Sequence, residues 1–328
     1  MNLWQRKILL MVSLLTLFGI NYKQSAQAQI LQDHIDQRKL SFHLPPQPSA
    51  SALSVPLTYK LETYNSRVME EIRTYGVSLP PGYDDNSTQR YPVIFLLHGG
   101  HGNPEDWFEP KGAALNTLQK LYTEGKLPPS IIITPDGNDK RGSSSHWDPQ
   151  YIDGPHGKVA TALGDELVKV VKNRYHTIPY RDFWAMGGLS SGGWGAINIG
   201  LHNLKNFSIL FSHSGYFKDR SGPQNSPVIY IKTVSPQATR NLRVYLDSGK
   251  LDSEEIAEAQ QFSQVLRQLS IYNVFREFPG SHTWRYWREH LADSLTFVGE
   301  QFKIAQIAHS TEDLGLKRSE DTEDARNP

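Results

Sequence analysis

Cysteine is absent from the 328 residues of this sequence. Without cysteine the chain has no disulfide bond, no thiol nucleophile and no thiolate ligand for a metal. The fold must therefore be stabilised by a hydrophobic core, for which the length of the chain suffices. The histidines show no spacing typical of metal ligands, so we expect neither a metal nor another cofactor.

An excess of charge of one sign is also missing, because 34 Lys and Arg residues balance 34 Asp and Glu residues. A chain with this balance offers no extended basic surface to a phosphate backbone. We therefore expect no nucleic-acid partner.

Long apolar runs are scarce, and the run at residues 8–20 is shorter than the roughly 20 residues of a membrane-spanning helix. Arg6 and Lys7 precede this run, and Ala26-Gln27-Ala28 follows it. This order is typical of a secretory signal peptide cleaved before Gln29. An uncleaved anchor is the alternative. We expect residues 1–28 to be removed and the mature chain to be secreted or periplasmic, without a stable membrane anchor.

Two segments flank the expected catalytic domain at residues 55–305. Residues 29–54 are polar and contain Pro45, Pro46 and Pro48, which predicts an irregular arm. Residues 306–328 are rich in charge, which predicts a disordered tail.

Between these segments, apolar strands alternate with helices, which predicts an α/β fold with a mostly parallel central sheet and helices on both faces. Two initial segments, 57–64 and 71–79, predict an antiparallel hairpin at an edge. The other expected strands are 93–97, 131–134, 183–186, 208–212, 242–247 and 273–278, and the expected helices are 159–175, 192–199, 253–269 and 284–302.

The pentapeptide Gly188-Leu189-Ser190-Ser191-Gly192 lies between an expected strand and an expected helix. In this order the glycines permit a sharp turn that exposes the central serine in a strained conformation. The N–H of the next residue, Ser191, is then free to bind an oxyanion. An ordinary glycine-rich turn is the alternative, but the context indicates that Ser190 is a nucleophile.

A serine nucleophile needs a histidine base and an acid that orients it, and in this order of elements both come later in the chain. His282 differs from the other downstream histidines because it lies in a loop just before the last helix, so we expect it to be the base. Asp247 and Asp252 are both candidates for the acid. Asp247 has a local alternative as a cap of the Ser248-Gly249 turn, and Asp252 as a helix N-cap. For Glu254 and Glu255, which begin the next helix, attraction to the helix dipole is a sufficient explanation.

The segment His98-Gly99-Gly100-His101-Gly102 follows the expected strand 93–97. Glycines let the backbone approach a substrate carbonyl, so we expect the N–H of Gly100 to join that of Ser191 in an oxyanion hole. A plain turn is the alternative, and we interpret His98 itself as structural.

The sequence resembles the putative-esterase group of α/β-hydrolases, which includes esterase D, feruloyl and acetyl-xylan esterases, enterochelin-type esterases and the mycolyltransferases. The motifs that carry the resemblance occur in the expected order at Leu79–Asp84, Tyr91–Gly100, Gly187–Gly195, Asp247–Asp252 and Gly280–Trp287. The resemblance implies an α/β-hydrolase fold. It also implies a catalytic triad with Ser190 as nucleophile, Asp252 as acid and His282 as base.

The resemblance implies that the protein is a serine esterase that forms an acyl-enzyme. Export favours a small or polysaccharide-linked acyl ester, of a carbohydrate or another extracellular alcohol, over a glutathione thioester. Trp107, Trp194 and Trp284 lie near the motif loops, where they would suit an aromatic acyl group or a sugar ring. An acyltransferase of the mycolyltransferase type would use the same triad, and a non-enzymatic binding module on a hydrolase fold is a further alternative.

Overall fold

The computed structural model describes residues 43–85, 87–144, 146, 151–219 and 221–313, the last three without their side chains. The chain divides into two compact units, Leu44–Gln306 and a second unit that combines Met1–His43 with Ile307–Pro328. The expected signal peptide at residues 1–28 lies outside the described residues. So do the expected arm up to residue 42 and the expected tail from residue 314.

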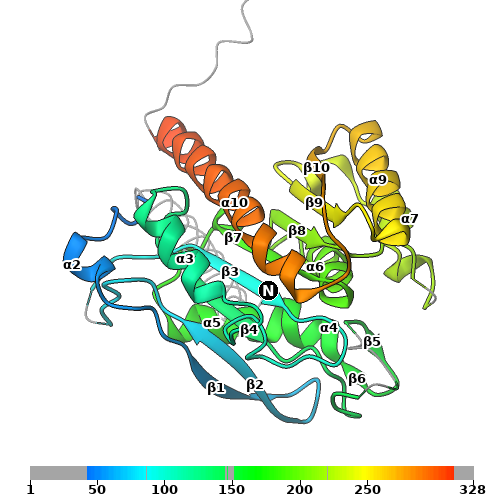
Figure 1. Cartoon of the computed structure of the whole chain (residues 1–328), viewed down its shortest axis with the longest axis horizontal. Coiled ribbons are helices and arrows are strands. Elements are labelled where there is room, and N and C mark those ends of the chain that lie inside the picture. Colours follow the sequence, from blue (N-terminus) through cyan, green and yellow to red (C-terminus); the bar gives the residue numbers. More distant parts are fainter. Residues whose placement is uncertain (1–42, 86, 145, 147–150, 220, 314–328) are drawn as a thin grey trace, which may run out of the picture. The chain divides into compact units, whose positions relative to one another are not determined.

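An eight-stranded sheet forms the centre of the unit Leu44–Gln306, in the order β1-β2-β4-β3-β7-β8-β9-β10 (Figure 1). The six strands β4, β3, β7, β8, β9 and β10 each run parallel to their neighbours in this order. Strands β1 and β2 form an antiparallel hairpin at one edge, and β2 pairs antiparallel with β4. The expected mostly parallel sheet with an edge hairpin is confirmed. The strands are β1 (Lys60–Ser66), β2 (Glu71–Ser78), β3 (Val93–Leu97), β4 (Ile131–Pro135), β7 (Trp184–Leu189), β8 (Ile209–His213), β9 (Arg243–Gly249) and β10 (Tyr272–Phe278).

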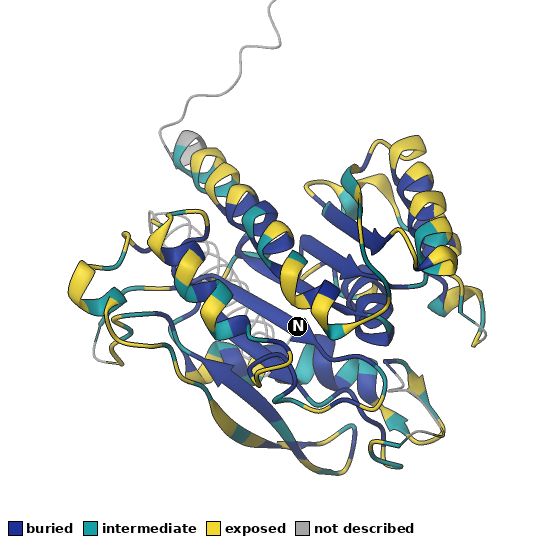
Figure 2. Ribbon diagram, in the orientation of Figure 1, coloured by how far each residue is buried: buried dark blue, intermediate teal, exposed yellow. Residues whose placement is uncertain are grey.

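Helices cover both faces of this sheet, as the alternation of elements predicts. Strand β3 shows why, because Val93 and Phe95 pack into the core on one face while Ile94 and Leu96 pack into the core on the other. A strand buried on both faces needs a helical layer on each side. Figure 2 shows the central strand β3 as buried, with exposed residues on the outer faces of the helices.

One helical layer consists of α3 (Ala114–Thr123) and α10 (Trp284–Asp313), whose apolar side chains share a core with Ile94 and Leu96. The opposite layer contains α5 (Leu167–Arg174), α6 (Ser191–His202) and α9 (Ser253–Gln268). A short π-helix, Ala162–Glu166, joins α4 to α5. The shorter elements are α2 (Ala50–Leu53), α4 (Val159–Thr161), α7 (Pro227–Tyr230), α8 (Pro236–Thr239), β5 (Asp153–Gly154) and β6 (Gly157–Lys158).

The compact unit Leu44–Gln306 contains the catalytic domain expected at residues 55–305. The compact unit begins at Leu44, whose N–H donates to Oε1 of Gln306 at 2.6 Å. At the other end, α10 continues to Asp313, because residues 301–313 contain neither glycine nor proline to end the helix. The charged composition predicted disorder from residue 306, but helix propensity prevails up to Asp313.

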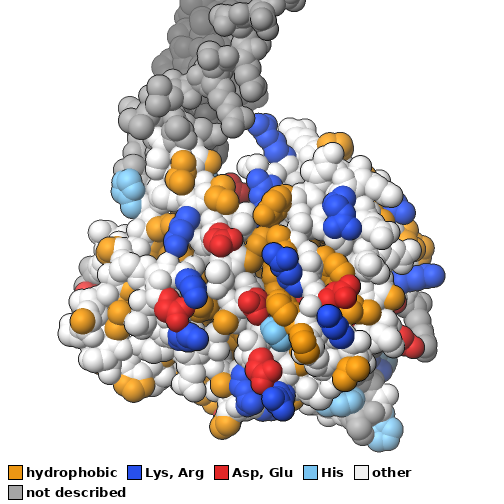
Figure 3. All heavy atoms as spheres, turned by 45° about the horizontal axis from the view of Figure 1, so that its top comes forward, with side chains coloured by type: hydrophobic (Ala, Val, Ile, Leu, Met, Phe, Trp, Pro, Cys, Tyr) orange, Lys and Arg blue, Asp and Glu red, His pale blue; other side chains and the backbone are white. Residues whose placement is uncertain are grey.

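Helix α3 was not expected from the sequence, although Leu115, Leu118 and Leu121 have helical spacing. Within the described part of the chain, no helix is both long and apolar enough to cross a membrane. On the face drawn in Figure 3, cationic and anionic side chains are interspersed, in keeping with the balanced composition.

Candidate active site

Ser190 lies at the sharp turn where β7 ends and α6 begins. Its backbone, at φ 52° and ψ −125°, occupies a region that costs a non-glycine residue about 1–3 kcal/mol. The turn is held by two backbone hydrogen bonds, from the Ser190 N–H to the His213 carbonyl at 2.9 Å and from the Trp194 N–H to the Ser190 carbonyl at 3.0 Å. The Ser190 hydroxyl does not cap the helix. It is therefore available to other partners.

Glycines allow the first turn of α6 to approach β3 closely. A Cβ atom on Gly188 would lie 2.5 Å from the Gly192 carbonyl oxygen, and one on Gly192 would lie 2.3 Å from the carbonyl oxygen of His98. Both obstacles are backbone atoms, which cannot rotate away as a side chain can. Close packing here requires glycine at both positions, and it brings the start of α6 beside the loop that follows β3.

His282 lies in the loop between β10 and α10. Its Nε2 atom is 2.8 Å from Oγ of Ser190, and its Nδ1 atom is 2.8 Å from Oδ2 of Asp252. The carboxylate accepts from Nδ1–H, which leaves Nε2 to accept from the serine hydroxyl. The edge of the ring packs against Trp287 with centroids 4.9 Å apart, and 37% of the side chain remains exposed. The structure therefore brings together the three residues that the sequence singles out.

Asp252 occupies the N-cap position of α9, but its side chain makes no capping hydrogen bond. The carboxylate is buried and faces His282 instead. Burial alone would raise its pKa, but interactions with Glu255, His282 and Ser214 outweigh burial and hold the pKa below its ordinary value. The alternative role as a simple N-cap is therefore not the one observed.

Asp247, the other candidate acid, does not contact His282. Its Oδ1 atom accepts a hydrogen bond from the Tyr286 hydroxyl at 2.9 Å, and its Oδ2 atom lies 2.8 Å from Nδ1 of His213. Nε2 of His213 in turn lies 2.9 Å from Oγ of Ser294. All of these side chains are buried. The expected cap of the Ser248-Gly249 turn is wrong, because Asp247 instead links β9 to β8 and α10.

Glu255, for which the sequence analysis gave attraction to the helix dipole as a sufficient explanation, lies near Asp252 and His282. Its carboxyl interacts with Asp252, and one ligand-type atom from each of Asp252, Glu255 and His282 lies within 4.8 Å of the other two. Burial raises the pKa of Glu255 to about 7, with a further contribution from the Asp252 carboxylate. Both ring nitrogens of His282 already have partners. The three side chains therefore suit the sharing of protons better than the coordination of a cation.

The loop after β3 carries the expected second oxyanion donor, Gly100. At its start, Nδ1 of His98 is 2.9 Å from the Gly99 carbonyl oxygen, and Nε2 accepts from the Gly137 N–H at 2.9 Å. Since Nε2 is an acceptor, Nδ1–H is the donor, so His98 fixes the loop in the structural role expected. A Cβ atom on Gly99 would lie 3.5 Å from Cβ of Ser190, so this loop borders the serine.

The three tryptophans expected to line the site differ in exposure. Trp107 is fully buried, and its indole N–H donates to the Leu97 carbonyl at 3.0 Å. Trp194 is 2% exposed, and its N–H donates to the Asn225 carbonyl at 2.9 Å. In this conformation both side chains are buried, so neither exposes its ring to a substrate. Trp284 is partly exposed and is the one of the three that a substrate can reach.

A shallow hollow of about 440 Å³ lies beside Trp284. The ammonium of Lys111 is 5.2 Å from the Trp284 ring centroid and 2.7 Å from Oδ1 of Asp106. The hollow is lined by Asn103, Glu105, Asp106, Glu109, Pro110 and Lys111. Amide and carboxylate groups next to an aromatic ring suit the hydroxyl groups and apolar face of a sugar.

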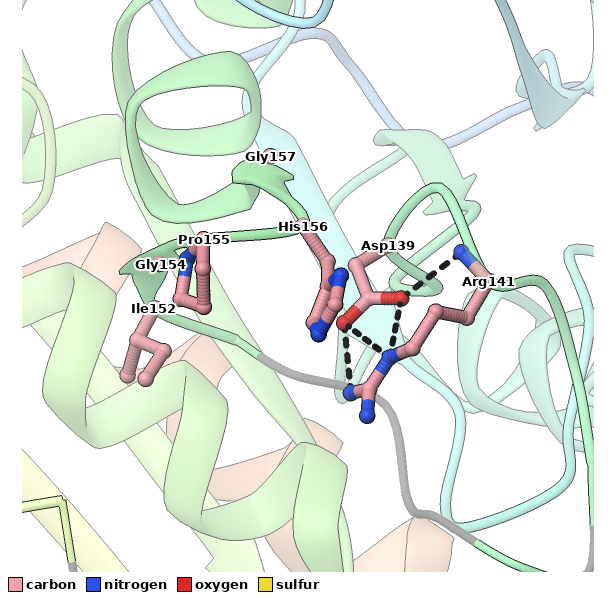
Figure 4. Close-up of a pocket in the computed structure, with 7 residues that line it drawn as sticks. All are labelled: Asp139, Arg141, Ile152, Gly154, Pro155, His156 and Gly157. Atoms are coloured by element: carbon pink, nitrogen blue, oxygen red, sulfur yellow. Dashed lines mark hydrogen bonds and ion pairs between the residues drawn. The ribbon is translucent and has the colours of Figure 1, made fainter.

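A separate pocket of about 240 Å³ lies between the loop after β4 and the β5–β6 hairpin (Figure 4). Asp139 and Arg141 point toward one another in it, with Nη2 of Arg141 2.7 Å from Oδ2 of Asp139, so their charges offset each other. Ser190 and His282 are not among its lining residues. A ligand in this pocket would therefore not contact the triad.

Comparison with known proteins gives a family match over most of this unit. A family model described as putative esterase matches residues 66–298. The chain is 23% identical over 272 residues to an acetyl esterase of Caldicellulosiruptor saccharolyticus, which covers 72% of this chain and 96% of that protein. It is 24% identical over 243 residues to an uncharacterized protein of Corynebacterium glutamicum, a match that covers 68% of this chain but 56% of that longer protein.

Among solved structures, a ferulic acid esterase superimposes with a TM-score of 0.67 and 26% sequence identity. The superposition covers 75% of this chain and 98% of the other. The arrangement of sheet and helices described above is thus that of an α/β-hydrolase.

Proposed function

We propose that this chain, which belongs to the putative esterase family and is a carboxylic ester hydrolase, works as a secreted serine esterase. The observation that supports the catalytic role most directly is the pair of 2.8 Å contacts that joins Ser190 to His282 and His282 to Asp252. They occur at a strained elbow, the geometry that exposes a nucleophilic serine. Secretion is supported by the sequence pattern of residues 1–28.

In the proposed mechanism, His282 takes the hydroxyl proton of Ser190 through Nε2 as Oγ attacks the ester carbonyl. Asp252 holds the imidazole in the tautomer that makes Nε2 an acceptor, and it stabilises the imidazolium that forms. The N–H groups of Ser191 and Gly100 receive the oxyanion. The imidazolium then protonates the leaving alcohol, and water activated by His282 releases the acid from Ser190.

We further propose that the substrate is an acyl ester of a carbohydrate, with an aromatic acyl group. Trp284 offers a partly exposed ring near His282, and the polar hollow beside it suits a sugar. The name of the ferulic acid esterase agrees with an aromatic acyl group, and the name of the acetyl esterase agrees with ester hydrolysis. The proposal predicts that a feruloylated oligosaccharide is hydrolysed with at least about tenfold higher kcat/KM than methyl ferulate or p-nitrophenyl acetate. Equal values for all three esters would contradict the carbohydrate assignment.

The test of the serine mechanism is Ser190→Ala. We expect hydrolysis of p-nitrophenyl acetate to fall by about a thousandfold or more, with an unfolding midpoint near that of the wild type. A fluorophosphonate probe should label the wild type and not the variant.

Ser191→Ala is the matched control, because only the backbone N–H of that residue has a proposed role. It should retain most of the activity. Activity of Ser190→Ala within tenfold of the wild type, or labelling of another residue, would remove Ser190 as the nucleophile.

A further inference from the structure

A carboxyl group outside the proposed triad lies beside the acid of that triad. Glu255 is the third residue of α9, three positions after Asp252 at the N-cap. At this spacing a glutamate normally reaches back to the N-cap backbone N–H, as one half of a capping box. Here the N–H of Asp252 donates instead to the Gly249 carbonyl at 2.9 Å. Glu255 thus does not complete the capping box. One of its carboxyl oxygens instead lies within 4.8 Å of ligand-type atoms of both Asp252 and His282, and its carboxyl group interacts with the Asp252 carboxylate.

Two carboxyl groups in such contact do not both ionise readily, because the charge on one disfavours the charge on the other. The dipole of α9 favours the ionised form of Glu255, which would lower its pKa. The pKa is instead raised to about 7 by burial and by Asp252. The pKa of Asp252 is lowered, so the proton that the pair shares resides on Glu255. The helix dipole is therefore not the interaction that decides the state of Glu255.

We propose that Glu255 is a positioning residue of the active site, which in its neutral form donates a hydrogen bond to Asp252 and so extends the triad to a fourth member. The proposal rests on the esterase mechanism above. The Glu255 proton stays on Glu255 through turnover and orients Asp252, while the proton of Ser190 moves only to His282 and then to the leaving alcohol. Above neutral pH, loss of the Glu255 proton adds a negative charge near His282 and favours the inactive imidazolium.

The charged groups that act on Glu255 come from two elements. Asp252 lies at the same end of α9, and His282 comes from the loop before α10. Ser214, from the loop after β8, faces Asp252 rather than Glu255. The ionisation of Glu255 is thus coupled to Asp252 and to the proposed base, His282, so the apparent pKa values belong to the three residues together.

The experiment compares Glu255→Gln, which imitates the neutral acid and keeps an N–H donor, with Glu255→Ala, which removes the donor. In Glu255→Gln we expect the acid limb of the kcat/KM profile for p-nitrophenyl acetate to move to lower pH by about half a unit to one unit. Its plateau should stay within about threefold of the wild type. Glu255→Ala should show the same direction of shift with a plateau about tenfold lower, because Asp252 loses its hydrogen bond.

Glu254→Gln is the matched control, since it removes the same formal charge from the exposed side of the same helical turn. Its profile should coincide with that of the wild type. All profiles are measured with EDTA present, so that a cation held by Asp252, Glu255 and His282 cannot produce the shift. An unmoved acid limb in Glu255→Gln, or equal losses at every pH in both Glu255 variants, would show a purely structural role and overturn the proposal.

A second readout does not depend on esterase activity. In the Ser190→Ala background, NMR should follow the His282 ring through its titration, with a lower midpoint when Glu255→Gln is added. An identical midpoint overturns the proposal for Glu255. Absence of ester hydrolysis in the wild type together with a lowered midpoint would count against the proposed function alone.

Discussion

At the scale of single residues, the contacts of two aspartates distinguish which of them is placed to orient the proposed base, His282. Asp252 contacts Nδ1 of His282, whereas Asp247 is buried against Tyr286 and His213. We expect Asp252→Asn to lower kcat by about three to four orders of magnitude, because an amide favours the wrong imidazole tautomer. Steady-state kinetics with p-nitrophenyl acetate measures the loss. The unfolding free energy should change little by comparison.

Asp247→Asn should have the opposite effect, lowering the unfolding free energy while leaving most of the activity. It removes one partner from a buried network, for which a loss of about 3 kcal/mol in unfolding free energy is expected. Activity per folded molecule should remain within about tenfold of the wild type. If Asp247→Asn were the more damaging change for kcat, Asp252 would not be the acid.

The site was largely predictable from the sequence where the signal is local, and less so where it depends on packing. Ser190 and His282 stand in segments whose order of strand, turn and helix is readable. The choice between Asp247 and Asp252 needed the family resemblance, because both lie near the end of the same strand, β9. Glu255 has the spacing of an ordinary capping box, so its contact with Asp252 has no separate sequence signal. The burial of Trp107 depends on α10, which is distant in the chain.

At the scale of elements, the position of Ser190 depends on how closely α6 approaches β3. A Cβ atom on Gly192 would lie 2.3 Å from the His98 carbonyl oxygen and 2.6 Å from that of Leu97. Alanine in a helix is favoured over glycine by about 1 kcal/mol, but here it would push the helix off the strand. We expect Gly192→Ala to cost about 3 kcal/mol or more in stability and to lower esterase activity, as measured by urea unfolding and by kinetics.

Gly142→Ala is the matched control for this prediction. Gly142 has φ +75°, but no atom lies within 4 Å of a Cβ placed there. Only the backbone conformation then opposes alanine, at about 1 kcal/mol, and the activity should be kept. Similar losses for both variants would mean that the approach of α6 to β3 is not what positions Ser190.

Sequence patterns predicted some elements of the fold and not others. The parallel strands were predictable because strands buried on both faces are continuously apolar, as in Val93–Leu97. The ends of the catalytic unit were not, since Leu44 and Gln306 join through a contact between residues 262 positions apart. Such a contact leaves no pattern in either segment.

For the whole molecule, the coupling of Glu255 to Asp252 predicts a pH dependence of stability. A carboxyl whose pKa is higher in the folded than in the unfolded chain holds its proton more tightly when folded. Its contribution to the unfolding free energy is complete at pH values below its ordinary pKa of 4.5. The contribution is lost as the pH rises through the pKa of about 7 in the folded chain. Because Glu255 is only half-buried, we expect a loss of about 1 kcal/mol, well below the full value of the shift.

Glu255→Gln cannot ionise, so it should escape this loss. Measured by urea unfolding, the stability of the variant relative to the wild type should rise by about 1 kcal/mol between pH 4.5 and pH 8. Glu254→Gln carries the same change of formal charge without contact to Asp252, and its stability relative to the wild type should stay nearly constant over this range. A Glu255→Gln difference that is flat with pH, or that falls, would mean that the folded protein holds Glu255 ionised at neutral pH. The charge it then carries beside Asp252 would have to be balanced by another group.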